Sequence, residues 1–171
     1  IQREIGADVI VGGPTKGDLR VRAQHRLATW GLRCKCIRCR ESGLRRVPLR
    51  PDEIRLHRMD YEASGGLELF LSYEDDSQET LVGYARLRIC NTGAFLRELK
   101  VFGRVVPISA RPGSRWQHRG YGARLLAECE RIAAEEHGRQ ELLVTSGVGV
   151  REYYRRFGYA QSGPYMAKAL E

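Results

Sequence analysis

Residues 117–122, Gln-His-Arg-Gly-Tyr-Gly, place two glycines at the start of what otherwise reads as an amphipathic helix. Each glycine inside a helix costs about 1 kcal/mol relative to alanine, so this position must need bare backbone. The first N–H groups of a helix lack internal partners and carry partial positive charge, which suits an anion. Gly120 and Gly122 would admit a phosphate to these amides, and Arg119 and Arg124 add positive charge. We therefore predict a phosphate or pyrophosphate site; the alternative is a glycine turn that serves only helix–strand packing.

Two common phosphate-binding motifs do not fit this segment. No Gly-Lys-Ser/Thr follows, as a Walker loop requires, and Ala123, Arg124 and Leu125 follow Gly122 where the dinucleotide motif would place a further glycine. The sequence therefore indicates a different kind of anion site.

The elements that must position this segment follow from hydrophobic periodicity. Residues 52–63 could be extended or helical, and an amphipathic helix near the N-terminus is expected to end at Gly31. The remaining expected elements are strands at 66–74, 80–90 and 95–103, a helix at 122–137, a strand at 141–147, a short helix at 150–159, and a turn with one last strand within 160–170. In the long helix a buried stripe is expected at Leu125, Leu126, Cys129, Ile132 and Ala133. This order predicts a mixed α/β domain with an antiparallel start rather than a doubly wound repeat.

The pattern Gln117-x-x-Gly120-x-Gly122 resembles the Q/R-x-x-G-x-G/A signature of the GNAT acetyltransferase family. The resemblance implies the GNAT fold, an α/β (α+β) domain with a mixed, mostly antiparallel central sheet flanked by helices. It also implies that this loop holds the pyrophosphate of acetyl-coenzyme A. The family often places a tyrosine of the second helix near the thioester sulfur, where a phenol can protonate the departing thiolate. Tyr153 and Tyr154 are the candidates here; we expect one to pack in the core and the other to face the site.

A closer resemblance covers essentially the whole chain. The blocks GLRCKCIRCRE, DYEASGGLELFLSYED, QHRGYG, EEHG, SGVGVREYYRRFGY and GPYM are similar, in this order, to the C-terminal part of the Elongator catalytic subunit family. That family of radical-SAM and acetyltransferase enzymes uses acetyl-coenzyme A to form a carboxymethyl group at C5 of the wobble uridine of tRNA. Its other half binds a 4Fe-4S cluster and S-adenosylmethionine through a cysteine-rich motif that this chain lacks. The resemblance implies a linker at 1–46, an acetyl-CoA-binding domain at 47–171 and a radical-SAM domain elsewhere in a larger protein.

The resemblance also assigns candidate cofactor residues. The expected set is Glu98, Leu99, Lys100 and Val101 on the preceding strand, toward the pantetheine arm, and Gln117, His118, Arg119, Gly120, Tyr121 and Gly122 around the pyrophosphate. Glu98 and His118 are also candidates for a general base, the alternatives being a strand-surface and a loop residue. Relatives carry histidine at the position of Lys100, so the chemistry would differ here if that side chain acts.

Three cysteines, Cys34-x-Cys36-x-x-Cys39, have the short spacing with which a loop wraps a metal ion. We expect structural zinc that fixes the basic linker, with His25, His57, water or the absent domain as the fourth ligand. Neighbouring cationic residues would stabilise thiolates. The alternatives are three free thiols, or an iron–sulfur cluster, for which the spacing fits poorly.

Charge is distributed unevenly along the 171 residues, whose net charge is +8. Residues 1–60 carry 14 Lys and Arg against 7 Asp and Glu, whereas residues 61–171 carry 15 against 14. A basic segment before a nearly neutral domain indicates contact with a polyanion, and we expect tRNA on residues 16–58; a simply basic, solvated surface is the alternative. There is no apolar run of 18 residues and no secretory pattern in the first residues, so we expect a reducing cytoplasm and no membrane.

Three functions of different classes therefore compete. The first is a tRNA-modifying acetyl-CoA enzyme, which the resemblance favours. The second is a protein lysine or small-amine N-acetyltransferase, which would need an acidic groove that the basic charge argues against. The third is an RNA-binding module without catalysis. The sequence leaves further subunits or a homodimer open.

Overall fold

The computed structural model describes residues 18–44, 51–102 and 120–170. Its contacts divide the chain into two units, Ile1–Cys39 and Arg40–Glu171. In the first unit, helix α1 (Leu19–Thr29) has no buried residue. Trp30 caps the helix, Gly31 after it adopts a positive φ of 67°, and the N–H of Leu32 donates to the carbonyl of Leu27 at 2.9 Å. This confirms the predicted glycine at the end of the helix. Helix α2 (Ile37–Arg40) follows at the division between the units.

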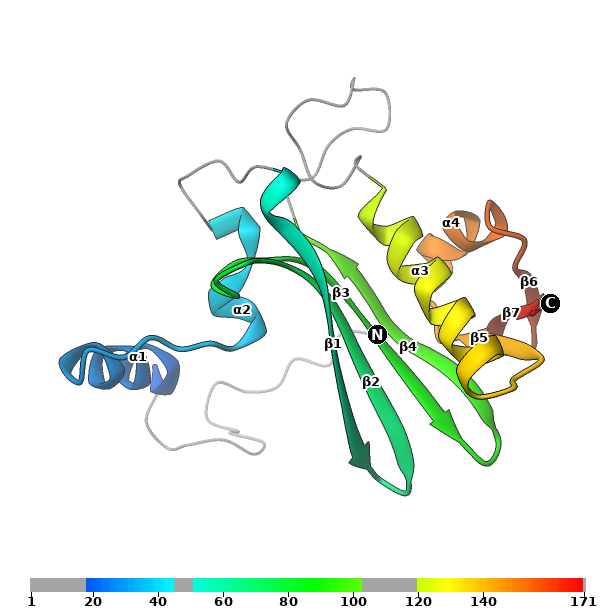
Figure 1. Cartoon of the computed structure of the whole chain (residues 1–171), viewed down its shortest axis with the longest axis horizontal. Coiled ribbons are helices and arrows are strands. Elements are labelled where there is room, and N and C mark those ends of the chain that lie inside the picture. Colours follow the sequence, from blue (N-terminus) through cyan, green and yellow to red (C-terminus); the bar gives the residue numbers. More distant parts are fainter. Residues whose placement is uncertain (1–17, 45–50, 103–119, 171) are drawn as a thin grey trace, which may run out of the picture. The chain divides into compact units, whose positions relative to one another are not determined.

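A seven-stranded sheet in the order β1-β2-β3-β4-β5-β7-β6 forms the second unit. The strands are β1 (Ile54–Ala63), β2 (Gly66–Asp75), β3 (Leu81–Cys90), β4 (Gly93–Val101), β5 (Glu141–Val144), β6 (Ala160–Ser162) and β7 (Tyr165–Ala169). All neighbours pair antiparallel except β4 and β5, which are parallel. Figure 1 shows β1 to β4 side by side, with α3 (Tyr121–Arg131) beside β4. The predicted mixed, mostly antiparallel sheet is confirmed.

Short helices complete the second unit. They are the 3-10 turns η1 (Ser42–Leu44), η2 (Pro51–Glu53) and η5 (Val148–Val150), the π-helical turn η4 (Ile132–Glu136), and α4 (Arg151–Arg155). The long helix predicted at 122–137 is therefore α3 continued by one π turn. No helix among the described residues has the length and apolar character that crossing a membrane would require.

The main core lies between α3 and one face of the sheet. Leu69 and Leu71 of β2, Leu87 of β3 and Leu96 of β4 are fully buried against α3 and η4. The helical residues of this core include Leu125, Leu126, Cys129, Ile132 and Ala133, which confirms the predicted stripe. Packing of this face fixes where α3 begins relative to the end of β4.

The structure decides one segment that the sequence left open and corrects the prediction for another. Residues 54–63, which the sequence left open between strand and helix, form the edge strand β1. The C-terminal segment, expected to hold one strand, forms two, because Gly163 adopts a φ of 56° and turns β6 back onto β7. The extra pairing gives β7 a hydrogen-bonded neighbour on each side.

Candidate acetyl-CoA site

The parallel pair β4–β5 opens at one end. Pairing joins Ala94, Phe95 and Leu96 to Leu142, Leu143 and Val144, and the N–H of Thr145 donates to the carbonyl of Leu96 at 3.0 Å. Strand β5 ends there, whereas β4 continues to Val101. Within the described sheet, residues 97–101 therefore lack strand pairing on the β5 side. Such an edge can hydrogen-bond an extended ligand that carries amide groups.

Helix α3 begins beside the far end of β4. Gly120 precedes it in the left-handed region, with φ 78° and ψ 8°, a conformation that glycine adopts readily. Among the described residues, no atom lies within 4 Å of the position that a Cβ at Gly120 would occupy, and the positive φ is itself a reason for glycine here. The carbonyl of Gly120 accepts a hydrogen bond from the N–H of Arg124 at 3.0 Å.

Gly122 has a different reason to be glycine. A Cβ on Gly122 would lie 2.7 Å from the Tyr153 hydroxyl oxygen and 3.6 Å from Cγ2 of Val101. The first turn of α3, the end of β4 and the short helix α4 therefore meet at this residue. This contact brings together three of the regions in which the sequence placed candidate site residues.

The two candidate tyrosines lie in different surroundings. Tyr154 is buried in the core, 5.8 Å between ring centroids from Tyr159, and burial raises its pKa to about 12. Tyr153 is half-buried between Tyr154 and Phe157, at 5.3 and 5.0 Å, and burial also raises its pKa. Its hydroxyl is the one that lies against Gly122. A phenol of this kind stays protonated at neutral pH and can act as an acid.

Tyr121, the first residue of α3, is buried among aromatic and aliphatic side chains. Its ring meets the edge of Tyr73 at 4.8 Å, and the Arg124 guanidinium lies 5.6 Å from its centroid. Ile54 and Val82 complete this small cluster. The side chain thus anchors the start of α3. Gln117, His118 and Arg119, also predicted at this site, lie outside the described residues.

The four candidate residues on β4 divide between the two faces of the sheet. Leu99 packs against the main core and Val101 against the cluster of Tyr121. Glu98 accepts a hydrogen bond from the Tyr84 hydroxyl at 2.7 Å and lies 3.4 Å from a guanidinium nitrogen of Arg86. Lys100 places its ammonium 4.8 Å from the ring centroid of Phe102. Glu98 and Lys100 therefore face away from α3.

The three cysteines of the first unit lie together. The Sγ atoms of Cys34, Cys36 and Cys39 are within 4.8 Å of one another. Arg20 donates to Sγ of Cys36 at 3.5 Å and of Cys39 at 3.0 Å, and the Arg20 hydrogen bond is the main cause that lowers the pKa of Cys36 to about 6. Zinc–thiolate bonds of about 2.3 Å need sulfurs about 4 Å apart, so this donor set fits zinc. Among the described residues, no histidine joins the group.

A carboxylate that the sequence analysis missed is Glu68. Its side chain is 1% exposed, and its Oε1 accepts hydrogen bonds from Arg88 at 2.9 Å and Arg97 at 2.6 Å. Arg86 also pairs with it, at 3.9 Å. The signal was present: Glu68 interrupts an apolar strand, and two arginines alternate along the strand after it.

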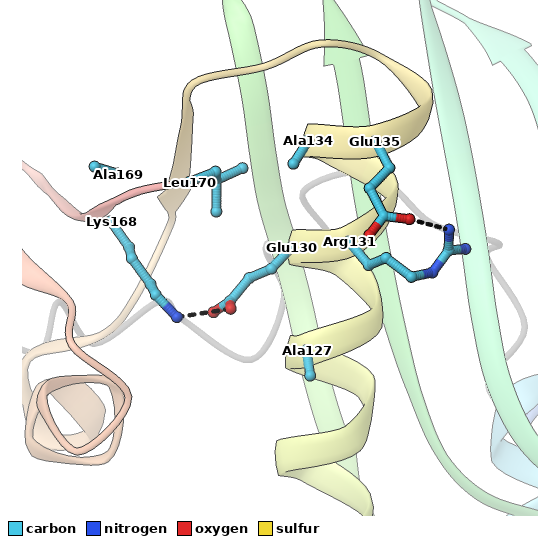
Figure 2. A pocket seen from close by; sticks show the side chains of 8 residues that line it. All are labelled: Ala127, Glu130, Arg131, Ala134, Glu135, Lys168, Ala169 and Leu170. Atoms are coloured by element: carbon cyan, nitrogen blue, oxygen red, sulfur yellow. Dashed lines mark hydrogen bonds and ion pairs between the residues drawn. The ribbon is translucent and has the colours of Figure 1, made fainter.

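A shallow hollow of about 410 Å³ lies along the second half of α3 and β7. Figure 2 shows Lys168 pointing to Glu130. The Lys168 ammonium donates to the Glu130 carboxylate at 2.7 Å, and the Tyr159 hydroxyl donates to the same carboxylate at 2.8 Å. These polar groups bond one another, and their contacts connect α3 to the C-terminal part of the chain. It begins at Ala127, more than one helical turn beyond Gly122.

The fold is that of an acetyltransferase domain. The family described as Acetyltransferase (GNAT) domain matches residues 56–169, and the chain belongs to that family. Over its whole length the chain is 46% identical to Elongator complex protein 3 of Drosophila melanogaster, covering 33% of that protein. It is likewise 46% identical to the tRNA uridine(34) acetyltransferase of Methanocaldococcus jannaschii, covering 34% of it.

A solved structure agrees with the same relationship. The archaeal Elp3 of Methanocaldococcus infernus, with residues 1–46 deleted, superposes with a TM-score of 0.80 at 45% identity, over 99% of this chain and 43% of the other. The chain thus spans about a third of the length of the curated relatives it matches. The predicted fold and the predicted relationship to the Elongator catalytic subunit are confirmed.

Proposed function

We propose that this chain binds acetyl-coenzyme A between β4, α3 and α4, and is the acetyltransferase part of an enzyme that modifies tRNA. The observation that carries the proposal is the meeting of Val101, Gly122 and Tyr153 at the open end of the β4–β5 pair. The family match and the name of the archaeal relative support acetyl transfer and a tRNA substrate. The finer proposal is a carboxymethyl-type group at C5 of the wobble uridine.

Each element has a separate task in the proposed site. The amides at the start of α3 bind the pyrophosphate, helped by the helix dipole and by Gln117, His118 and Arg119. The unpaired edge of β4 at Leu99, Lys100 and Val101 hydrogen-bonds the amides of the pantetheine arm. Bound acetyl-coenzyme A would supply a thioester whose acetyl group is activated for transfer. Tyr153 holds a proton at its hydroxyl, near the turn, that a thiolate leaving group would accept, while Tyr154 supports its ring from the core.

The cysteine group has a structural role in this proposal. Cys34, Cys36 and Cys39 would hold zinc and fix α1 relative to the loop that follows it, through Arg20 and Gln24. The 4Fe-4S cluster and S-adenosylmethionine would be bound by a radical-SAM domain in the remainder of a longer protein. We place the reaction in the cytoplasm.

Titration with desulfo-coenzyme A tests the binding part directly. We expect saturable binding to this chain that Gly122→Val abolishes, because a larger side chain meets Tyr153 and Val101. Ala127→Val, at an exposed position on the same helix, is the matched control and should leave affinity unchanged. Binding that both variants leave intact would show that the ligand lies elsewhere.

Release of coenzyme A from acetyl-coenzyme A tests the substrate class. Release that depends on tRNA supports the proposed reaction. Release that depends on a free amine instead would identify an N-acetyltransferase, and the tRNA assignment would be wrong. Binding of tRNA without any release from the full-length enzyme would favour a non-catalytic RNA-binding module.

A further inference from the structure

The sheet face opposite α3 carries both cations and aromatic rings. Strand pairing aligns Tyr61, Glu68, Arg88 and Phe95 in one row across β1 to β4, and Met59, Phe70, Arg86 and Glu98 in the next. A third row contains His57, Ser72, Tyr84 and Lys100. Residues paired across strands point to the same side of a sheet. Three cations and four aromatic side chains therefore share this face with two carboxylates.

A β-bulge adds a fourth cation. Arg86 pairs with Glu98 while Leu87 pairs with Leu96, so Arg97 is an extra residue in β4. It reaches across β3 to Glu68 on β2, at 2.6 Å. Bulges commonly redirect a side chain at functional sites. Here the bulge adds a guanidinium to the same carboxylate that Arg88 already contacts.

Glu68 holds these guanidinium groups in place without neutralising them. One buried carboxylate faces Arg86, Arg88 and Arg97, and Glu98 is engaged by Tyr84 and Arg86. With Lys100, the patch keeps two positive charges in excess. The side chain of Arg97 is 46% exposed, so its guanidinium has donors left for a ligand. Arginines whose positions are fixed in advance bind phosphate groups at a lower entropic cost.

The aromatic groups indicate which polyanion fits. Tyr61 is 37% exposed, and Met59, two residues before it on the same strand, is 63% exposed. A phosphate chain alone needs no such neighbours. Unpaired bases, by contrast, stack on exposed aromatic rings of a sheet while arginines bind the backbone.

We propose that the exposed residues of this face bind single-stranded RNA, with Arg86 and Arg97 on phosphates and Tyr61 against a base. The proposal deepens the proposed function, on which it rests for the class of partner, by naming the surface that receives the RNA. Strand β4 then separates the two ligands: Leu99 and Val101 lie on the α3 side, and Arg97 and Glu98 on the RNA side. Of the basic segment 16–58 that the charge distribution indicated, only His57 belongs to these three rows.

The test measures binding of a fluorescein-labelled twelve-nucleotide oligouridylate to this chain by anisotropy, at several salt concentrations and without coenzyme A. We expect Arg97→Gln and Arg86→Gln each to weaken binding several-fold, and the slope of log affinity against log salt to fall by about 0.7 for each phosphate that the variant no longer binds. Arg156→Gln, at an exposed arginine just after α4, is the matched control and should change neither quantity. Equal effects of Arg97→Gln and Arg156→Gln would overturn the proposal.

Conservative variants distinguish a side chain that contacts the RNA from one that only maintains the structure of the face. Arg97→Lys should restore the salt slope, whereas a slope as shallow as in Arg97→Gln would mean that the residue acts only through Glu68. Tyr61→Ala should weaken binding about five-fold or more and Tyr61→Phe should not. Decaglutamate is the competing ligand. If it binds as tightly as the RNA, and if Tyr61→Ala weakens the binding of neither ligand, the face is a docking surface for an acidic protein segment instead.

A second titration keeps this test independent of the proposed function. Desulfo-coenzyme A should bind Arg97→Gln with unchanged affinity, because the residue faces away from α3. Loss of RNA binding with intact coenzyme binding supports the RNA surface. Intact RNA binding in every variant overturns it even where the coenzyme site is confirmed.

Discussion

The Tyr153 hydroxyl lies where a side chain on Gly122 would begin: a Cβ there would be 2.7 Å from the phenolic oxygen. Real Cβ atoms essentially never approach another heavy atom so closely, so the glycine of α3 and the tyrosine of α4 constrain each other. The same glycine lies next to Val101 at the end of β4. A change in either partner is therefore expected to move the other.

The first prediction uses this mutual constraint. Gly122→Ala alone should weaken coenzyme A binding about ten-fold or more, because Tyr153 must shift or the turn must open. Tyr153→Phe removes the oxygen and leaves the nearest ring carbon at the ordinary distance of 3.7 Å. In that background Gly122→Ala should cost much less. A double-mutant cycle by calorimetry measures the coupling, and additive effects would contradict the contact.

The other glycine of the turn gives a control. Gly120→Ala meets no neighbouring atom of the described residues but must adopt a φ of 78°. We expect it to lower the unfolding free energy by about 1 kcal/mol, an effect that Tyr153→Phe does not relieve.

The second prediction separates the two tyrosines by role. Tyr153→Phe should lower turnover of acetyl-coenzyme A about 100-fold, the usual contribution of a positioned acid, while leaving binding nearly unchanged. Tyr154→Phe should change turnover little, because its ring packs in the core. Single-turnover kinetics with the full-length enzyme and tRNA measures both. Equal losses for the two variants would assign them a common structural role.

How much of this arrangement the sequence could predict depends on periodicity. The sequence predicted the apolar helix stripe from Leu125 to Ala133 because these side chains face one continuous core. Strand β1 was ambiguous because charged residues occupy both of its faces, and Arg58 is used for ion pairs with Asp60 and Glu136. A period-2 pattern appears only where one face is buried, which this edge strand does not provide.

The sequence predicted parts of the candidate site but not the whole arrangement. The glycine motif identified the turn, but the motif alone suggested one shared reason for Gly120 and Gly122. The structure shows two, a positive φ and a close contact. The contacts of Glu68 with Arg88 and Arg97 depend on strand order and on a bulge, which spacing along the chain does not encode.

The third prediction concerns the cysteines and α1. This helix has 11 residues and none is buried against the described part of the chain, so it is too short to be stable alone in water. If zinc holds the cysteine group, a chelator should increase amide hydrogen exchange across residues 19–29. Elemental analysis should find about one zinc per chain, lost in Cys36→Ser and retained in Cys90→Ser. Metal-free protein with an equally protected α1 would contradict the structural role.

The fourth prediction is alkaline sensitivity of the core. Burial raises the pKa of Tyr154 to about 12 from an ordinary value of 10.0, so folding favours the protonated phenol. The contribution of this group to stability is complete below pH 10 and is lost as the pH rises through 12. At pH 11 the unfolding free energy of the wild type should have lost about 1 kcal/mol through this group, a loss that Tyr154→Phe avoids. Urea denaturation at pH 8, 10 and 11 measures the difference between the two proteins. A gap that stays constant over this range would show that Tyr154 is not buried as a neutral phenol.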